Sequence, residues 1–202
     1  MREASDVPLK NPAHDVDGRA RRASYEVSRP SRGLEPNPGD RHEHPAANPI
    51  PHGLHTITPH LVCQGAAAAI EFYKEAFGAV EMFRLAGPDG KLVHAMVRIG
   101  DSSLMLVDQF EQMGARGPKL LGGSPVTIHL SVSDADAVAR RAQAAGAELR
   151  MPVTEMFWGA RYGVLQDPFG HLWSVATQVR DLSAEEIAEA MRHQPQGDCP
   201  GA

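Results

Sequence analysis

The turn at residues 167–170, with the sequence DPFG, constrains the fold of this chain more than any other feature. It lies between two runs that are typical of strands, residues 161–166 and 171–178. Aspartate accepts hydrogen bonds from the backbone two residues on, proline fixes φ at the next position, and glycine adopts a positive φ. Two apolar runs joined in this way predict a β-hairpin. A weaker copy of this hairpin lies earlier in the chain, which indicates a duplicated module rich in strands.

The first copy begins near Leu54. Residues 57–63 alternate as a strand does, and the helical spacing of Ile70, Tyr73 and Phe77 is followed by Gly78, which predicts a helix that ends at this glycine. Three further strands are expected, separated by glycine-rich turns, at residues 79–86, 91–100 and 102–109.

The second copy repeats this order. Residues 125–133 alternate cleanly, and a helix is expected at 134–145, with Ser133 as its N-cap and Gly146 as its end. Three strands are again expected, at residues 147–158, 161–167 and 171–179. Pro152 predicts that the first of these three is an edge strand or a bulged one, because proline cannot donate to a ladder.

The repeated order predicts an α+β fold made of two β-α-β-β-β modules, residues 54–110 and 124–180, with a polar linker between them. Agreement in the order of elements and in the breaking residues indicates internal duplication. Two such modules can pair their sheets about a pseudo-two-fold axis and leave a concave cleft, which is a favourable place for a ligand.

The flanking segments differ from this domain. Residues 1–53 hold eight of the 16 prolines and few large apolar residues, which predicts a disordered tail. Three histidines of this tail, His42, His44 and His52, match no closed metal site. Residues 181–202 predict a short helix at 183–193, begun by a capping box of Ser183 and Glu186, and then a tail.

Composition excludes several functional classes. A formal net charge of −5 gives no reason to expect nucleic-acid binding. The two cysteines, Cys63 and Cys199, lie in a strand and in the C-terminal tail, so a structural disulfide is not expected. No apolar stretch is long enough to span a membrane, and the N-terminus lacks the apolar region of a signal peptide. The prediction is a cytoplasmic protein.

Two segments, AAAAIEFYKEAFGA in the first module and RYGVLQDPFGH in the second, resemble the vicinal oxygen chelate superfamily. That superfamily includes glyoxalase I, bleomycin and fosfomycin resistance proteins and extradiol dioxygenases. The chain is most similar to the PhnB-like group, and the resemblance covers about residues 54–180. It implies the paired-module fold and a homodimer, because these proteins often complete their clefts across a dimer.

The resemblance also implies four positions for the ligands of a divalent metal ion. In this chain they are His60, Met105, His129 and Ser174. The two histidines suit a metal, but methionine and serine replace the carboxylates of glyoxalase I-like members. Catalytic metal sites usually show three protein ligands. His60 and His129 are therefore either metal ligands or general bases, or polar residues that line the cleft without chemistry.

Three further residues are candidates for acid–base chemistry. His171, just after the hairpin turn, could point into the cleft or bond a neighbouring backbone carbonyl. Glu155 could serve as a base or as a third metal ligand, or be an exposed residue at the end of a strand. His94 could touch the cleft or be a core histidine held by one hydrogen bond.

An aromatic and cationic cluster lies beside the second predicted sheet. Phe157, Trp158 and Tyr162 could form an apolar pocket, and Arg161 could orient a small anionic or planar ligand. The alternative is a hydrophobic mini-core or a dimer contact.

Three functions stay open at this point. The first is a metal-dependent lyase or dioxygenase of the glyoxalase type, with His60 and His129 as ligands and a third ligand from Glu155 or His171. The second is a metal-free protein that binds a drug or a metabolite through its aromatic cluster. The third is an interaction protein that recruits a partner through the helix at 183–193 or through the tail.

Overall fold

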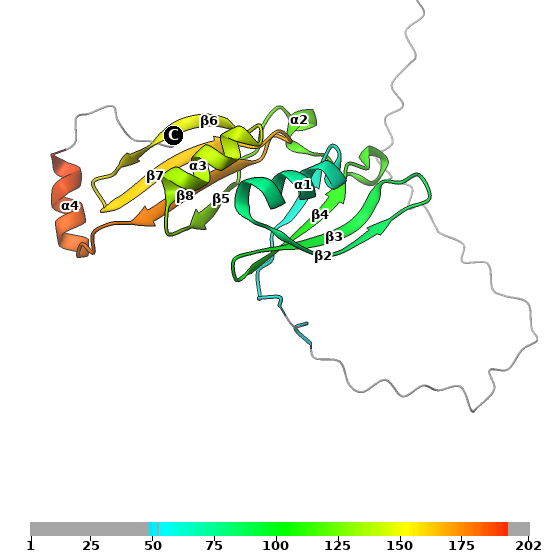
Figure 1. The fold of residues 1–202 in the computed structure, drawn as a ribbon, viewed down its shortest axis with the longest axis horizontal. Coiled ribbons are helices and arrows are strands. Elements are labelled where there is room, and N and C mark those ends of the chain that lie inside the picture. Colours follow the sequence, from blue (N-terminus) through cyan, green and yellow to red (C-terminus); the bar gives the residue numbers. More distant parts are fainter. Residues whose placement is uncertain (1–48, 52, 194–202) are drawn as a thin grey trace, which may run out of the picture. The chain divides into compact units, whose positions relative to one another are not determined.

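The computed structural model describes residues 49–51 and 53–193 of the 202-residue chain. It contains two four-stranded mixed sheets, each accompanied by a long helix (Figure 1). The predicted α+β fold of two β-α-β-β-β modules is confirmed. Nearly all of the predicted tail, with His42, His44 and His52, lies outside the described residues, and so does Cys199.

The first module has the sheet order β1-β4-β3-β2, in which β1 runs parallel to β4. Its elements are β1 (His60–Cys63), α1 (Ala66–Phe77), β2 (Val80–Ala86), β3 (Leu92–Ile99) and β4 (Ser102–Asp108). The expected end of the helix is confirmed, because Gly78 adopts a φ of 68° and its N–H bonds the carbonyl of Lys74. The start of the helix lacks a side-chain cap of its own, and the buried carboxylate of Asp108 accepts from the N–H groups of Gly65 and Ala66 instead.

The second module repeats the topology, with the order β5-β8-β7-β6 and β5 parallel to β8. Its elements are β5 (Thr127–Ser131), α3 (Ala135–Ala144), β6 (Glu148–Glu155), β7 (Ala160–Gln166) and β8 (Leu172–Gln178). Strand β6, which contains Pro152, is an edge strand with two register irregularities, as predicted. The prediction of Ser133 as N-cap is wrong. Asp134, one residue later, is the N-cap of α3, and its carboxylate accepts from the N–H of Ala137 at 2.8 Å.

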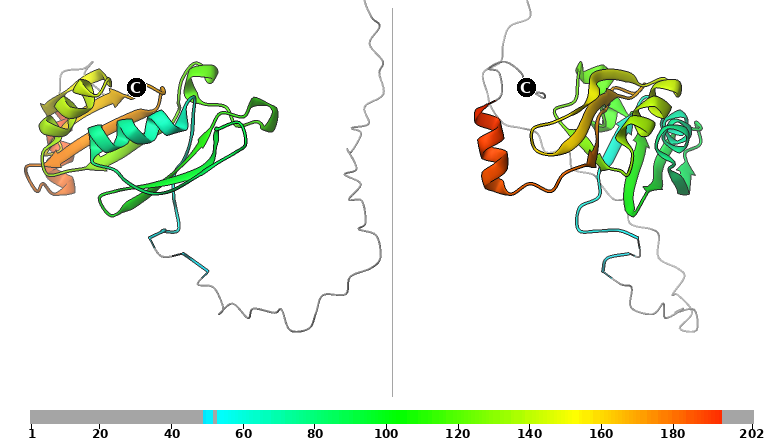
Figure 2. Two further views of the ribbon diagram at one scale, coloured as in Figure 1. Left: turned by 45° about the vertical axis from the view of Figure 1, so that its right-hand side comes forward. Right: turned by 60° about the vertical axis from the view of Figure 1, so that its left-hand side comes forward.

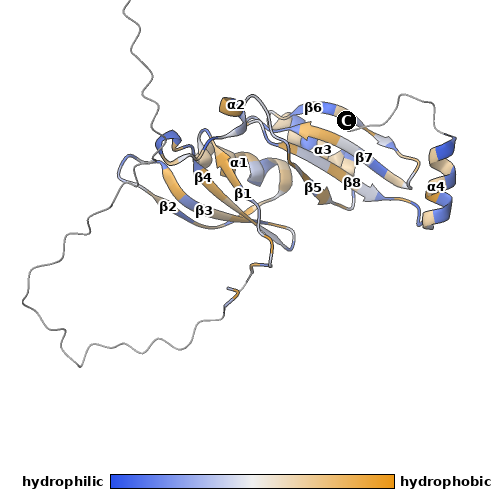
Figure 3. Cartoon of the chain, turned by 180° about the vertical axis from the view of Figure 1, so that it is seen from behind, coloured by the Kyte–Doolittle hydropathy of each residue, from blue (hydrophilic) through white to orange (hydrophobic). Residues whose placement is uncertain are grey.

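The linker between the modules is more ordered than its polar composition indicates. It contains a 3₁₀ turn, η1 (Glu111–Met113), and a short helix, α2 (Pro118–Leu121). Pro118 begins α2 and Gly122 ends it with a φ of 77°, an arrangement that suits both residue types. The C-terminal helix α4 (Ala184–Arg192) starts with the predicted capping box of Ser183 and Glu186. None of its residues is buried, and hydrophilic and hydrophobic residues alternate along its ribbon (Figure 3) with the spacing of an amphipathic helix.

A single hydrophobic core joins the two modules. Helices α1 and α3 are in contact, and α1 lies against one face of the first sheet (Figure 2). The rings of Tyr73 and Phe77 on α1 pack on Trp173 of β8, with centroid distances of 5.2 and 4.6 Å. Trp173 and Tyr73 are fully buried, so a side chain of the second module packs in a core that it shares with the first module.

The predicted hairpin turn is confirmed, and its aspartate does more than shape the turn. Asp167 accepts from the backbone N–H groups of Phe169 and His171, both at 2.9 Å. Its second oxygen accepts from the hydroxyl of Tyr73 at 2.7 Å and from the indole N–H of Trp173 at 3.0 Å. Because Tyr73 belongs to the first module, this buried carboxylate also holds the modules together.

Each sheet has a second face, which α1 or α3 does not cover. On the first sheet the buried residues of β3 and β4 alternate with residues that point away from α1. We call this side the first open face; it includes His60, Phe83, Leu85, His94, Met96 and Met105. The corresponding side of the second sheet is the second open face, with His129, Tyr162, Val164, Ser174 and Ala176. No helix of the described residues is long and apolar enough to cross a membrane.

Candidate functional site

A groove of about 840 Å³ lies on the second open face, and three of the predicted site residues line it. Tyr162 stacks against His129 with a centroid distance of 6.3 Å and an interplanar angle of 17°. Trp158 meets Tyr162 edge to face at 5.7 Å. The rest of the lining consists mostly of small or polar side chains: Ser131, Val132, Ser133, Ala160, Ala176, Thr177 and Gln178. We call this hollow the aromatic groove.

Strand register explains why these rings can form a groove. Tyr162 on β7 pairs with Ala176 on β8, and His129 on β5 pairs with Ser174. Each large ring therefore stands beside a small side chain, which leaves space above the middle of the sheet. Phe157 continues the series by contacting Trp158 at 4.9 Å, just before β7 begins. The structure thus brings Phe157, Trp158 and Tyr162 together with His129.

The imidazole of His129 is held in place by Ser174. The Nδ1 atom and the serine hydroxyl share a hydrogen bond of 2.8 Å. Ser174 is buried, so this bond fixes the ring orientation from below and leaves the opposite edge of the imidazole facing the groove. The imidazole of His129 is thus a fixed polar group among aromatic rings, and such a group can orient a small ligand through a hydrogen bond.

Arg161 does not join the aromatic groove. Successive residues of a strand point to opposite faces, so Arg161 lies on the α3 side of the sheet while Tyr162 lies on the other. Its guanidinium donates to both carboxylate oxygens of Asp136, at 2.6 and 2.7 Å, and this pairing lowers the pKa of the Asp136 carboxyl. The structure therefore assigns Arg161 to an ion pair with α3.

Glu155 is also separate from the histidines. It is exposed at the end of β6 and forms a salt bridge with Arg180 at 3.0 Å. Its partner in the strand register is Arg161, so both side chains belong to the same side of the sheet.

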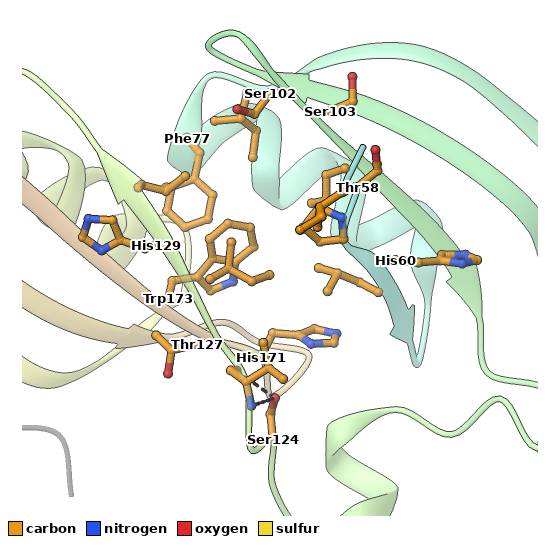
Figure 4. Close-up of a pocket in the computed structure, with 18 of the residues that line it drawn as sticks. Thr58, His60, Phe77, Ser102, Ser103, Ser124, Thr127, His129, His171 and Trp173 are labelled. Atoms are coloured by element: carbon orange, nitrogen blue, oxygen red, sulfur yellow. Dashed lines mark hydrogen bonds between the residues drawn. The ribbon is translucent and has the colours of Figure 1, made fainter. Parts of the chain in front are cut away.

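A second and larger hollow, of about 1080 Å³, lies between the modules. Residues of β1 and β5 line it, and Phe77 and Trp173 lie at its base (Figure 4). His60 and His129 lie at opposite sides of this inter-module pocket, and their rings point away from each other (Figure 4). Apolar side chains, among them Leu61, Ile128 and Leu130, make up the larger part of the lining between them.

His171 is buried in the wall of the inter-module pocket. Its Nε2 lies 3.2 Å from the carbonyl oxygen of Val62 and 3.7 Å from the sulfur of Cys63. Since a carbonyl can only accept, Nε2 carries the proton, and burial lowers the pKa of the ring. Burial and the charge of Asp167 raise the pKa of the Cys63 thiol to about 12. This arrangement holds a neutral thiol and a neutral imidazole, which suits a structural contact between modules.

The first open face carries a feature that sequence reasoning left open. The rings of His60 and His94 are 5.8 Å apart, edge to face, and Phe83 meets His94 at 5.2 Å. Partial burial and the neighbouring charge of His94 lower the pKa of His60. The alternation of residues along β3 predicts on which face of the sheet His94 lies. The contact between His60 and His94 could not be predicted in this way, because it depends on the strand order β1-β4-β3.

The residues of one chain do not fit a hard divalent ion. Among the described residues, no three His, Cys, Asp or Glu side chains lie close enough to hold a metal. The two positions that would supply carboxylates hold the thioether of Met105 and the hydroxyl of Ser174, and the hydroxyl is already bonded to His129. Such ions take carboxylate or water oxygens and a compact set of ligands.

Comparison with known proteins fits this geometry. The chain is 50% identical over 144 residues to the uncharacterized protein Mb0911c of Mycobacterium bovis, a match that covers 70% of this chain and 95% of that protein. It is equally similar to the uncharacterized protein Rv0887c of Mycobacterium tuberculosis, where the match covers 85% of the relative. The solved structure of the Arabidopsis thaliana gene product At5g48480 is 29% identical, with a TM-score of 0.50, over 61% of this chain and 98% of that one.

The pattern of one family extends over more than half of the chain. Residues 36–175 match the glyoxalase/bleomycin resistance protein/dioxygenase superfamily. This span includes both modules up to the middle of β8, and the duplicated fold described above is the one expected for it. The chain belongs to the glyoxalase/bleomycin resistance protein/dioxygenase superfamily.

Proposed function

We propose that this protein binds a planar, largely apolar small molecule in the aromatic groove. The observation that carries the proposal is the series of rings His129, Tyr162 and Trp158, which line the groove among small side chains. Phe157 supports this series from outside the groove by its contact with Trp158. Aromatic walls with one fixed polar group favour flat ligands that stack and accept or donate one hydrogen bond. A charged orienting group is absent from this part of the structure, since Arg161 is paired on the other side of the sheet.

We infer further that the protein acts as a homodimer of the PhnB-like group. Support for the dimer comes from the first open face, where Phe83 and Leu85 are 43% and 58% exposed. Exposed apolar side chains that adjoin one another mark contact surfaces. If the first open face of a second copy covers the aromatic groove, the groove becomes an enclosed cleft. Support for the PhnB-like group comes from the two sequence segments that resemble it.

The test is a thermal-shift screen of uncharged planar compounds against the full chain. A ligand of the groove raises the melting temperature of the parent, and the shift falls sharply in Tyr162→Ala. The matched control is Arg161→Gln, one residue away on the opposite face, which keeps the full ligand-induced shift. Equal shifts in Tyr162→Ala and the parent contradict binding in the groove.

The rival is a metal-dependent enzyme of the glyoxalase type. Because His60 and His129 point away from each other in one chain, such a site requires His60 of one copy and His129 of another. A dimer in which the first open face of one copy covers the aromatic groove of the other brings these two histidines to one interface. The experiment is metal analysis of the full chain after loading with Zn, Ni, Mn or Fe. Bound metal near one equivalent per chain that is lost in both His60→Ala and His129→Ala supports this rival. Metal content that is equal in the parent and both variants excludes it.

A further inference from the structure

A row of potential soft metal ligands crosses the first open face. In the strand register His60 on β1 pairs with Met105 on β4, and Met105 pairs with Met96 on β3. Directly paired residues of neighbouring strands hold their Cβ atoms about 5 Å apart. The three side chains therefore lie next to one another on a single face of the sheet.

A second imidazole reaches the same place. His94 precedes Met96 by two residues on β3 and so lies on the same face. The His60 and His94 rings approach to 5.8 Å although strand β4, with Met105, lies between their own strands. The two rings thus lean towards each other across β4. The convergence gives two imidazoles and two thioethers within one small area.

The chemistry of this group is selective. Thioethers are soft ligands that favour Cu(I) and similar ions, and imidazole binds the same ions. The nearest acid in the adjoining strand, Glu81, belongs to the opposite side of the sheet, where it pairs with Lys74. A site without an anionic ligand suits a monovalent ion better than a divalent one, because less charge has to be neutralised.

We propose that His60, His94, Met96 and Met105 form a binding site for a soft monovalent cation, Cu(I) or Ag(I). All four ligands come from one sheet of one module. The site uses no residue of the aromatic groove, although both proposals involve the first open face that the proposed dimer covers. The silver titration follows Met96 and Met105 alone, so either proposal can fail while the other holds.

The test uses methionine methyl groups as reporters of the site. The chain has eight methionines, and ¹³C labelling of their methyl groups gives one NMR signal for each. The protein is the full chain with Cys199→Ser, which removes a competing thiol, and the probe is silver nitrate in chloride-free buffer. Signals are assigned by their disappearance in Met96→Leu and Met105→Leu, substitutions that keep the volume of the side chain.

The expected result is that the Met96 and Met105 signals shift first and saturate at one equivalent of Ag(I). Met113, which is 83% exposed on η1, and Met151 on β6 serve as internal controls and stay in place during that equivalent. His60→Gln and His94→Gln each weaken the silver affinity by about tenfold or more, because even the loss of a partner that only orients a metal ligand commonly costs that much. Zn(II) at the same concentration leaves both signals unmoved.

Three results would overturn the proposal. One is the absence of any shift of Met96 and Met105 while the rest of the spectrum shows a folded protein. Another is a parallel shift of Met113 and Met151, which indicates binding to methionines in general. The last is an unchanged silver affinity in both histidine variants, because the imidazoles would then take no part.

Discussion

The two open faces have the same backbone plan and different surface chemistry. On the first sheet the central row reads His60, Met105, Met96 and Phe83 across the strands β1, β4, β3 and β2. On the second sheet the corresponding row reads His129, Ser174, Val164 and Met151 across β5, β8, β7 and β6. The duplicated modules thus keep one histidine in register and differ at every other position of the row.

This difference shows how a duplicated fold can carry a different surface on each of its two open faces. On the second face Ser174 is small, bonds His129 and leaves room for the rings of Tyr162 and Trp158. On the first face the long thioether of Met105 fills the equivalent place beneath two imidazoles. The topology supplies the same positions twice. The residue next to the histidine that both modules keep, Met105 on the first sheet and Ser174 on the second, decides whether the face is filled by a long side chain or left hollow as a groove.

The largest expected effect comes from breaking the link between the modules. Asp167→Ala leaves four hydrogen-bond donors without their acceptor, among them the hydroxyl of buried Tyr73 and the indole of buried Trp173. Loss of such a buried charged acceptor costs about 3–5 kcal/mol in the free energy of unfolding. Urea denaturation measures it. Asp101→Ala, whose side chain bonds only exposed Ser102, should change the unfolding free energy by less than about 0.5 kcal/mol.

A single unfolding transition for the parent is part of the same expectation. The modules share the ring contacts of Phe77 and Trp173, so they should unfold together. Two separated transitions in the parent would show that Asp167 does not join one cooperative unit.

The next effect concerns the apolar part of the first open face. Phe83→Glu places a charge where the proposed dimer buries an aromatic ring, and it should weaken association by about 2 kcal/mol or more, a factor of roughly thirty. Sedimentation velocity over a range of concentrations measures the change. Met113→Glu, on exposed η1, is the matched control and keeps the parent's association. Identical sedimentation of Phe83→Glu and parent would remove this face from the interface.

How far could the sequence lead? The duplicated order of elements, the helix ending at Gly78 and the hairpin at 167–170 follow from local spacing and turn chemistry, and the structure bears them out. The cluster of Phe157, Trp158 and Tyr162 could be predicted from the sequence because these residues are close together in the chain. Arg161 shows the limit, because adjacency along a strand places a residue on the opposite face.

Contacts between distant segments could not be predicted in this way. Nothing near Asp167 in the sequence indicates that it accepts from Tyr73, 94 residues away. The approach of His60 and His94 requires the order β1-β4-β3, which alternation along single strands does not give. Strand order and register, more than residue type, separate the predicted parts of the site from the unpredicted ones.

A smaller effect concerns the pH dependence of stability that buried His171 contributes. Burial holds the pKa of His171 below its usual 6.5, so the unfolded chain binds a proton that the folded chain does not. The unfolding free energy should therefore fall as the pH drops below about 6.5, with a slope of at most about 1.4 kcal/mol per pH unit. His171→Gln, which keeps a donor for the carbonyl of Val62, should flatten this slope in urea titrations from pH 7.5 to 5. An equally steep slope in the variant would assign the effect to other groups.

The smallest effect is expected in α4, which no buried residue ties to either module. Ser183→Ala removes one half of the capping box and costs about 1 kcal/mol of local helix stability. Hydrogen exchange should quicken within residues 184–192 while the global unfolding free energy stays unchanged. A loss of global stability would show that α4 belongs to the cooperative core.

The central claim is that a small molecule binds in the aromatic groove, and the two tryptophans of the chain give its most direct test. Trp158 lines the groove, whereas buried Trp173 lies at the base of the inter-module pocket. The measurement is fluorescence titration of the parent and of Trp158→Phe with a planar compound from the screen. Our account predicts strong quenching in the parent and almost none in Trp158→Phe, where only Trp173 emits. Equal quenching of Trp173 in the variant would place the ligand in the inter-module pocket and contradict the account.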